Sequence, residues 1–347
     1  MTNGIKQFSY DALKSIVSFS ELEKREQFSK SIFSLKKIDA LFPHHFDKIT
    51  VGSEFVEIKI GEIIRCWQFV PVNPDAPNTF YRGSYRGENR DIEKFSHCTI
   101  SLSVGVDRTR RNFELDKRYE GLMMKLLKEY LRKGSKVDVL RIYALPPNLA
   151  ELGNVKLEVK QLRFDRITPD TFHPWLAVIS DEEPFEQVKF VVCTETMFMI
   201  REPRIQSCTR LCLQFPYYDT ISLEDWFANL PNQHIDVIHL DFPMEILTVM
   251  IRKWVNWRRP LGTTFTLGIQ YYTTVLDAFD MAQAELKGKL SNFPEITNSF
   301  CTHCCTIPVD DQREVVIYGG RKAEKYPPFD WNLKVEVMKK GRTVLKQ

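Results

Sequence analysis

The sequence contains no long apolar run and no secretory signal. No stretch approaches the roughly 20 apolar residues that a membrane-spanning helix needs. The first ten residues have neither the apolar core nor the small-residue cleavage site of a signal peptide. We therefore expect no membrane partner, and we expect a cytoplasmic location with the nucleus as a further compartment.

The chain also lacks a strong charge of either sign and the motifs of common enzyme sites. Its 48 basic and 45 acidic residues give a net charge of only +3, whereas nucleic-acid-binding domains usually carry a basic excess. The phosphate loop, the dinucleotide fingerprint, the nucleophile elbow and the zinc-peptidase motif are all missing. These absences predict no nucleic-acid partner, no catalytic residues and no cofactor, so we do not expect an enzyme.

One cluster of metal-ligating residue types is present near the C-terminus: Cys301, His303, Cys304 and Cys305. A structural zinc site commonly uses two pairs of ligands, each pair separated by about two residues. Here the two adjacent cysteines point in different directions, and no second pair is near in sequence. We therefore expect buried, reduced cysteines and no metal site.

Along the chain, the residue pattern predicts four segments. Apolar residues recur at threes and fours between Phe8 and Phe42, which is typical of helices, and residues 1–48 are expected to form a small helical unit. Alternating patterns over Phe55–Ile60 and Thr99–Val104 indicate strands in a β-rich segment, residues 49–118. Residues 119–270 are expected to form a repeat array, and residues 271–347 a C-terminal α+β cap.

The strongest pattern is a recurring apolar triplet at positions 1, 4 and 6. Its middle residues are separated by 22, 26, 23, 27 and 27 positions and are Leu140, Leu162, Val188, Leu211, Ile238 and Phe265. This period resembles that of leucine-rich repeats, in which each repeat adds one strand and neighbouring repeats bury a shared core.

Helices are expected between these strands, over Tyr119–Arg132, Thr168–Ile179, Ser222–Leu230 and Met244–Trp257. Alternating strands and helices favour parallel strand pairing. The predicted fold class is thus α/β, an irregular leucine-rich-repeat-like strand-helix solenoid that follows the small helical unit and the β-rich segment.

A column of residues between the last two apolar positions of each triplet is the candidate client-binding surface. In chain order it reads Arg141, Arg163, Lys189, Cys212 and His239. Basic side chains in register on a concave sheet would suit an acidic or phosphorylated segment of a partner. We predict client contacts from Arg141, Arg163, Lys189 and His239. The alternative is an ordinary solvated sheet face.

Several stretches together resemble a known family. They read FSYDALKSIVSF from Phe8, SLKKIDALFP from Ser34, WFANLPNQHIDVIHLDF from Trp226 and WVNWRRPLGTTF from Trp254, followed by EVVIYGG and WNLKVEV. The chain is similar to the nematode F-box C proteins, with an F-box-like unit followed by that family's associated domain of unknown function. Ser9 replaces the proline usual in an F-box, and Phe33 lies near the position of the usual tryptophan.

The resemblance implies a substrate receptor that binds a Skp1-like adaptor and a cullin, and that presents an unidentified protein client for ubiquitin transfer. The adaptor-binding residues would be five apolar side chains of the helical unit: Phe8, Leu13, Ile16, Val17 and Leu22. The alternative is a stand-alone repeat interaction protein whose N-terminal helices only cap the solenoid, since repeat arrays need a cap at each end.

Overall fold

The chain folds into two compact units. The computed structural model describes residues 24–27, 38–39, 42–72, 97–104, 109–115, 119–146, 148–153, 155–165, 167–216, 224–239, 242–294, 303–326 and 329–345. Unit 1 comprises Met1–Lys160 and Asp170–Glu183, and unit 2 comprises Gln161–Pro169 and Pro184–Gln347. The boundary falls within strand β7 (Glu158–Phe164).

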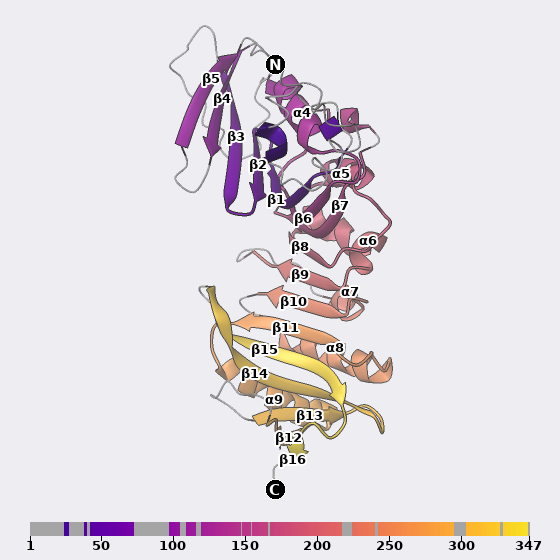
Figure 1. Ribbon diagram of the computed structural model, residues 1–347. Helices are drawn as coiled ribbons and strands as arrows, with labels where there is room; N and C mark the ends of the chain where they lie inside the picture. The colour runs from indigo at the N-terminus through magenta and orange to yellow at the C-terminus, as the bar shows by residue number, and fades with distance from the viewer. Residues whose placement is uncertain are drawn as a thin grey trace, which may run out of the picture. The chain divides into compact units, whose positions relative to one another are not determined.

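Unit 1 is built on a meander of strands with one helical crossover (Figure 1). Its elements are β1 (His45–Val51), β2 (Phe55–Ile60), β3 (Ile63–Val72), β4 (His97–Val104), β5 (Thr109–Leu115), α4 (Tyr119–Tyr130), β6 (Lys136–Ile142), η2 (Leu149–Leu152) and, from Asp170 onward, α5 (Pro169–Val178). The strands from β1 to β5 pair antiparallel in chain order, and β6 pairs parallel with β1. β1 has a strand on each side, and its residues Phe46, Ile49 and Val51 are completely buried.

Unit 2 joins a parallel array to an antiparallel one (Figure 1). The parallel part contains the end of β7, β8 (Gln187–Val191), η3 (Thr194–Arg201), α6 (Pro203–Gln206), β9 (Arg210–Gln214), α7 (Glu224–Ala228), β10 (His234–Ile238), α8 (Met244–Asn256) and β11 (Thr264–Ile269). The remaining elements are α9 (Thr273–Leu286), β12 (Lys289–Asn292), β13 (His303–Pro308), β14 (Arg313–Tyr326), β15 (Phe329–Lys339) and β16 (Val344–Leu345). β15 pairs antiparallel with β11, so β11 joins the two parts.

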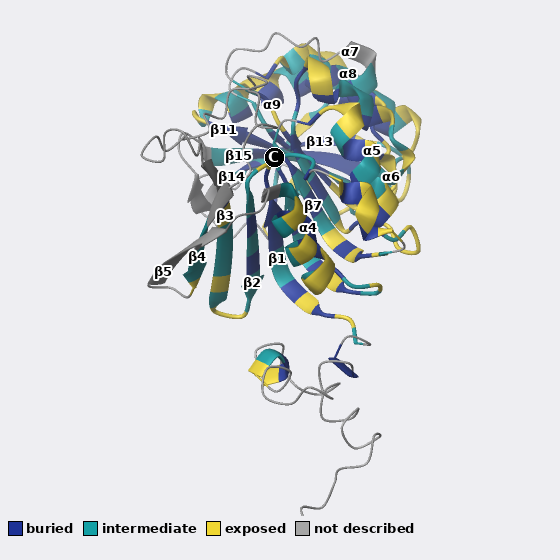
Figure 2. Ribbon diagram, turned by 90° about the horizontal axis from the view of Figure 1, so that it is seen from above, coloured by how far each residue is buried: buried dark blue, intermediate teal, exposed yellow. Residues whose placement is uncertain are grey.

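The parallel strands of unit 2 bury one face and leave the other face partly exposed. Burial alternates along β8 and β10, as expected where only one side of a sheet is packed. One core row, aligned by strand pairing, consists of Leu162, Val188, Leu211, Ile235 and Phe265. Helices α7, α8 and α9 lie next to one another along one side of these strands (Figure 2).

The predicted α/β class is confirmed as a mixed α/β protein with open strand order in the described residues. The helices predicted at 119–132, 168–179, 222–230 and 244–257 are all present with slightly shorter bounds. β2 has the predicted bounds, and β4 begins two residues earlier than predicted. Of the described helices, none combines the length and the apolar character needed to cross a membrane.

The fifth predicted repeat is out of register by three residues. Ile235, not Ile238, pairs with Leu211 and Phe265 in the core row, and Ile238 is on the partly exposed face. The first position of this triplet is therefore Asn232, which is 2% exposed. Its amide donates hydrogen bonds of 2.9 Å to the carbonyl oxygens of Ile205 and Cys208. Backbone acceptors satisfy the side-chain NH2 group of Asn232 at this core position, whereas its side-chain oxygen is buried without a hydrogen-bond partner among the described residues.

Candidate functional site

The polar face of the parallel strands in unit 2 brings two of the predicted client-binding residues together. Arg163 of β7 pairs with Lys189 of β8, so the two cations occupy adjacent strands in the same row. The row continues through Cys212, Asp236 and Thr266. Arg163 and Lys189 are both half-buried, which is ordinary for long side chains on a solvated sheet. The result is a pair of neighbouring positive charges on the face opposite the core.

Polar contacts along this row neutralise its one carboxylate. Arg210 lies 3.7 Å from Asp236, measured from Nε to Oδ2, and the Cys212 thiol donates to the same oxygen at 3.4 Å. Arg163 donates a hydrogen bond of 3.2 Å to the side-chain oxygen of Gln161. Within the described residues, Lys189 forms no ion pair. The charge left over on this face is therefore positive, at Arg163 and Lys189 and, at the other end of the row, at Lys334 of β15, which pairs with Thr266.

The thiol in the row is not suited to nucleophilic chemistry. Burial, followed by the charge of Asp236, raises the pKa of Cys212 to about 12. A hydrogen bond of 2.8 Å from the amide of Gln187 lowers the pKa but does not offset the burial. Because the thiolate is the reactive form, Cys212 stays protonated and inert near neutral pH.

The strand pairings given above for unit 2 do not include the other two predicted client residues. Arg141 belongs to β6 of unit 1, where it pairs with Thr50 of β1 and its guanidinium lies 4.5 Å from the centre of the Tyr143 ring. His239 follows β10, outside the row, and its ring centre lies 5.0 Å from that of Phe215. Asp236 takes the place that the sequence analysis gave to His239, because of the three-residue shift in β10.

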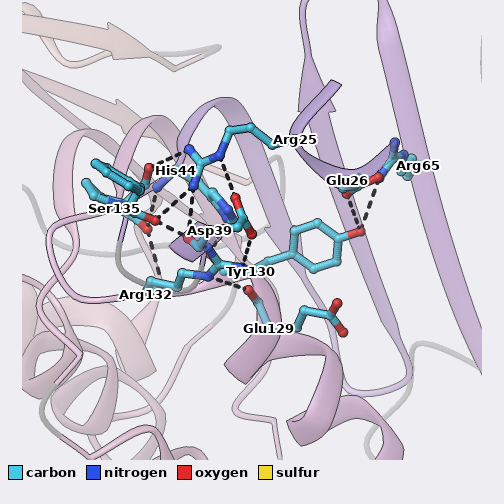
Figure 3. A network of polar contacts seen from close by, with 11 residues as sticks. Arg25, Glu26, Asp39, His44, Arg65, Glu129, Tyr130, Arg132 and Ser135 are labelled. Atoms are coloured by element: carbon cyan, nitrogen blue, oxygen red, sulfur yellow. Dashed lines mark hydrogen bonds and ion pairs between the residues drawn. The ribbon is translucent and has the colours of Figure 1, made fainter. Parts of the chain in front are cut away.

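A second polar cluster, in unit 1, was not predicted from the sequence (Figure 3). We call it the N-terminal clasp and define it by Arg25, Asp39, His44 and Arg132. Arg25 and Arg132 bind opposite oxygens of the Asp39 carboxylate, at 2.6 Å to Oδ1 and 2.9 Å to Oδ2. Arg25 also donates to the carbonyl of Pro43 at 3.1 Å. The clasp thus ties two N-terminal segments, residues 24–27 and 38–39, to the chain just after α4.

The electrostatics of the clasp follow from its burial. Burial alone would raise the pKa of Asp39, but the hydrogen bonds and charges of Arg25 and Arg132 outweigh it and hold the pKa below its ordinary value. Burial lowers the pKa of His44 to about 3, and the charges of the two arginines act in the same direction. His44 is therefore neutral, with its backbone N–H bound to Ser135 Oγ at 3.1 Å.

A neighbouring contact connects residue 26 to two further elements of unit 1. Arg65 of β3 lies 2.5 Å from Glu26, and the Tyr130 hydroxyl donates to the same carboxylate at 3.1 Å (Figure 3). Arg25 and Glu26, which are adjacent in the sequence, thus bind different partners. The sequence offered no signal for this arrangement, because Arg25, Glu26 and Asp39 have no apolar or motif pattern of their own.

The predicted adaptor-binding residues, Phe8, Leu13, Ile16, Val17 and Leu22, lie outside the described residues, as does Cys301 of the cysteine cluster. Cys304 and Cys305 are completely buried in β13. Burial raises the pKa of Cys305 to about 12. The described residues include no group of three or more side chains placed to hold a metal ion.

Comparison with known families adds one finding to this geometry. A family model described as a domain of unknown function, DUF3557, matches residues 118–271. The matched span begins next to α4 and ends just after β11, so it includes both Arg163 and Lys189. A search of curated proteins finds no match to the chain.

Proposed function

We propose that this protein is a non-enzymatic interaction scaffold that acts as an F-box-type substrate receptor for a cullin-based ubiquitin ligase. In this proposal an irregular, leucine-rich-repeat-like solenoid presents the client, and the N-terminal helical unit binds a Skp1-like adaptor. A receptor of this kind needs no chemistry of its own, because it acts by holding the client near the ligase.

The observation that carries the scaffold role is the pairing of Arg163 with Lys189 on a polar sheet face. The opposite face is packed, so the cations are positioned by a rigid strand array and not by a loop. Two adjacent cations favour carboxylates or a phosphate group on the partner. The receptor role is supported separately, by the resemblance of residues 8–19 and 34–43 to the F-box C proteins.

The client-binding part is tested by changing Arg163→Glu and Lys189→Glu together. Proteins that co-purify with the tagged chain are quantified by mass spectrometry. The control is Lys339→Glu with Lys340→Glu, two exposed cations at the end of β15, which changes the net charge equally. We expect a set of partners to be lost from the first variant and kept by the control. Equal partner sets in both variants would remove the client-binding role from this face.

The adaptor-binding part is tested by changing Ile16→Asp and Val17→Asp. We expect the wild-type chain to co-elute with a co-expressed Skp1-like adaptor in size-exclusion chromatography and the variant to elute alone. The control is Leu276→Asp with Val344→Asp, two apolar residues that are 46% and 58% exposed. Adaptor binding by the Ile16/Val17 variant at wild-type strength would reject the assignment.

The clasp favours a second candidate, a stand-alone interaction protein whose N-terminal helices serve as a cap. Arg25 and Asp39, 6% and 7% exposed, attach the two described N-terminal segments to the rest of unit 1 through their ion pairs, while Lys24 and Gln27 are exposed. This candidate predicts that the wild-type chain does not bind the adaptor, while partners that depend on Arg163 and Lys189 are retained. The two experiments above therefore separate the two candidates.

A further inference from the structure

The β2–β3 hairpin of unit 1 and Tyr130 of α4 line a small hollow. Its lining consists of three isoleucines, an arginine and a tyrosine: Ile58, Ile60, Ile63, Arg65 and Tyr130. Strand pairing joins the hairpin residues in one surface, because Ile58 pairs with Arg65 and Ile60 pairs with Ile63, which places all four on one face. The hollow has a volume of about 300 Å³, including solvent at its mouth. It is therefore at the lower end of the range for small-molecule sites and is large enough to receive an amino-acid side chain.

The charge in the lining of the hollow is already neutralised. Arg65 lies 2.5 Å from the carboxylate of Glu26 and donates a hydrogen bond of 3.1 Å to the Tyr130 hydroxyl (Figure 3). The side chains of Arg65 and Glu26 are only 16% and 22% exposed. An anion could bind Arg65 only by displacing Glu26 from a partly buried ion pair, which is costly. Because the other walls of the hollow are largely aliphatic, it favours an uncharged, apolar occupant.

The contacts of Glu26 bring the N-terminal part of the chain to the edge of this hollow. Residues 24–27 are helical, and Glu26 binds two of the lining residues, Arg65 and Tyr130. Just before them, the sequence SELE from Ser20 has the spacing of a capping box, in which a serine begins a helix and a glutamate follows three residues later. A helix that begins there places Leu22 on the same face as Glu26, with Cβ atoms about 5–6 Å apart.

This attachment favours an occupant from the same chain over a separate molecule. A group that is tethered by a short linker has an effective concentration in the millimolar range at its binding site. A partner protein or a second copy would need a comparable concentration, or further contacts, to displace it. Glu26 therefore gives Leu22, an apolar residue one helical turn away, the advantage in filling the hollow.

We propose that Leu22 packs into the hollow against Ile60 and Ile63, and that this contact anchors the segment before residue 24 on the β2–β3 hairpin. The inference goes beyond the function proposed above, because it holds whether or not the chain binds an adaptor. It gives Leu22 an internal contact in place of the adaptor contact that the family resemblance implies. Both candidate functions are compatible with it.

The contact is tested by methyl NMR on the full chain, labelled at the methyl groups of leucine and at the δ1 methyl groups of isoleucine. The signals are assigned from their loss in the variants Leu22→Met, Ile60→Val, Ile63→Val and Ile64→Val. We expect nuclear Overhauser cross-peaks from Leu22 to Ile60 or Ile63, and none to Ile64. Ile64 is the matched control, because it follows Ile63 in the sequence but lies on the opposite face of the hairpin and is 36% exposed.

Hydrogen exchange of the hairpin amides, followed by mass spectrometry, measures how much the contact protects the hairpin. We expect Leu22→Ser to speed exchange in residues 55–65 by about fivefold or more, because the hairpin opens more readily without its cover. Leu13→Ser, which changes another leucine of the N-terminal segment, should alter it by less than about twofold. Ile63→Ser should speed exchange about threefold less in the Leu22→Ser chain than in the wild-type chain, because both changes remove the same contact. Ile64→Ser should have equal effects in the two chains.

The proposal is overturned if Leu22 shows no cross-peak to Ile60 or Ile63, or if Leu22→Ser and Leu13→Ser speed exchange equally. A mixture of chains labelled only at leucine with chains labelled only at isoleucine separates contacts within one chain from contacts between copies. Cross-peaks between Leu22 and Ile63 in that mixture would show that a second copy fills the hollow, which would also overturn the proposal.

Discussion

At the scale of single residues, the clasp shows how unit 1 accommodates buried charge. Two arginines share one carboxylate, so the buried group carries a net positive charge that backbone carbonyls help to stabilise. Arg132 donates to the carbonyl of Phe42 at 3.3 Å, and Arg25 to the same carbonyl at 3.2 Å. Breaking a buried pair of this kind leaves an uncompensated charge, which is costly. His44 lies beside both cations and therefore cannot accept a proton without further repulsion.

His44 makes the stability of unit 1 sensitive to acid. Its folded-state pKa of about 3 lies below the ordinary value of 6.5, so the unfolded chain binds more protons across that interval. The stabilisation is complete above pH 6.5 and is lost as the pH falls toward 3. Between pH 7 and 4.5 we expect the free energy of unfolding to fall by about 2 kcal/mol through this group.

The measurement is urea unfolding followed by circular dichroism at a series of pH values between 7 and 4.5. His44→Gln removes the titrating group and is expected to flatten the profile over this range. His173→Gln, at an exposed position in α5, is the control and should keep the wild-type slope. Parallel profiles for wild type and His44→Gln would show that His44 is not the source of the acid sensitivity.

At the scale of helices and strands, apolar periodicity predicted where the elements are, but not their alignment. The helix at Met244–Asn256 was predicted within one residue because Leu247, Met250, Ile251 and Trp254 form a continuous buried face. The register of β10 was predicted wrongly because Ile235 and Ile238 both fit the triplet. The correct triplet begins at Asn232, and because this buried residue is polar, the apolar pattern did not include it.

Asn232→Leu tests this explanation. By sequence pattern alone, the change completes the apolar triplet and should stabilise the fold. The structure predicts the opposite, because the buried carbonyls of Ile205 and Cys208 would each lose the hydrogen bond that they accept from Asn232. We expect a loss of about 2 kcal/mol in the free energy of unfolding, measured by urea denaturation. Asn229→Leu, at an exposed position, should change it by less than about 0.5 kcal/mol. A stabilised Asn232→Leu protein would contradict the account of the register.

At the scale of the whole molecule, the sequence predicted the parallel strands but not which distant strands pair with them. The period of the triplets identified the strands from β7 to β11 because each adds similar apolar residues at similar spacing. Nothing local indicates that β15, about 70 residues after β11, pairs with it, or that β1 pairs with β6. Such pairings depend on contacts between distant segments, which periodicity does not report. Arg163 and Lys189 could be aligned from the sequence because each lies within a repeated triplet. The residues of the clasp could not, because they come from distant segments without a repeated pattern.

Because of these distant pairings, we expect that the span matched by the family model does not fold by itself. A fragment of residues 118–271 keeps β6 and β11 but loses β1 and β15. The fragment would therefore expose one unpaired strand edge in unit 1 and another in unit 2, and would remove the fully buried Phe46, Ile49, Leu333 and Val335 from their cores. Unpaired edges with apolar surface promote aggregation.

We expect this fragment to be aggregated or unfolded in size-exclusion chromatography and circular dichroism, while a control fragment of residues 24–345 elutes as a folded monomer. The control keeps the clasp, the β1–β6 pair and the β11–β15 pair. The comparison therefore tests whether the residues on either side of the matched span are needed for folding. A monomeric, cooperatively unfolding 118–271 fragment would show that β1 and β15 are dispensable. In that case the stability of the parallel strands would come from the stacked triplets alone, as in a self-sufficient solenoid.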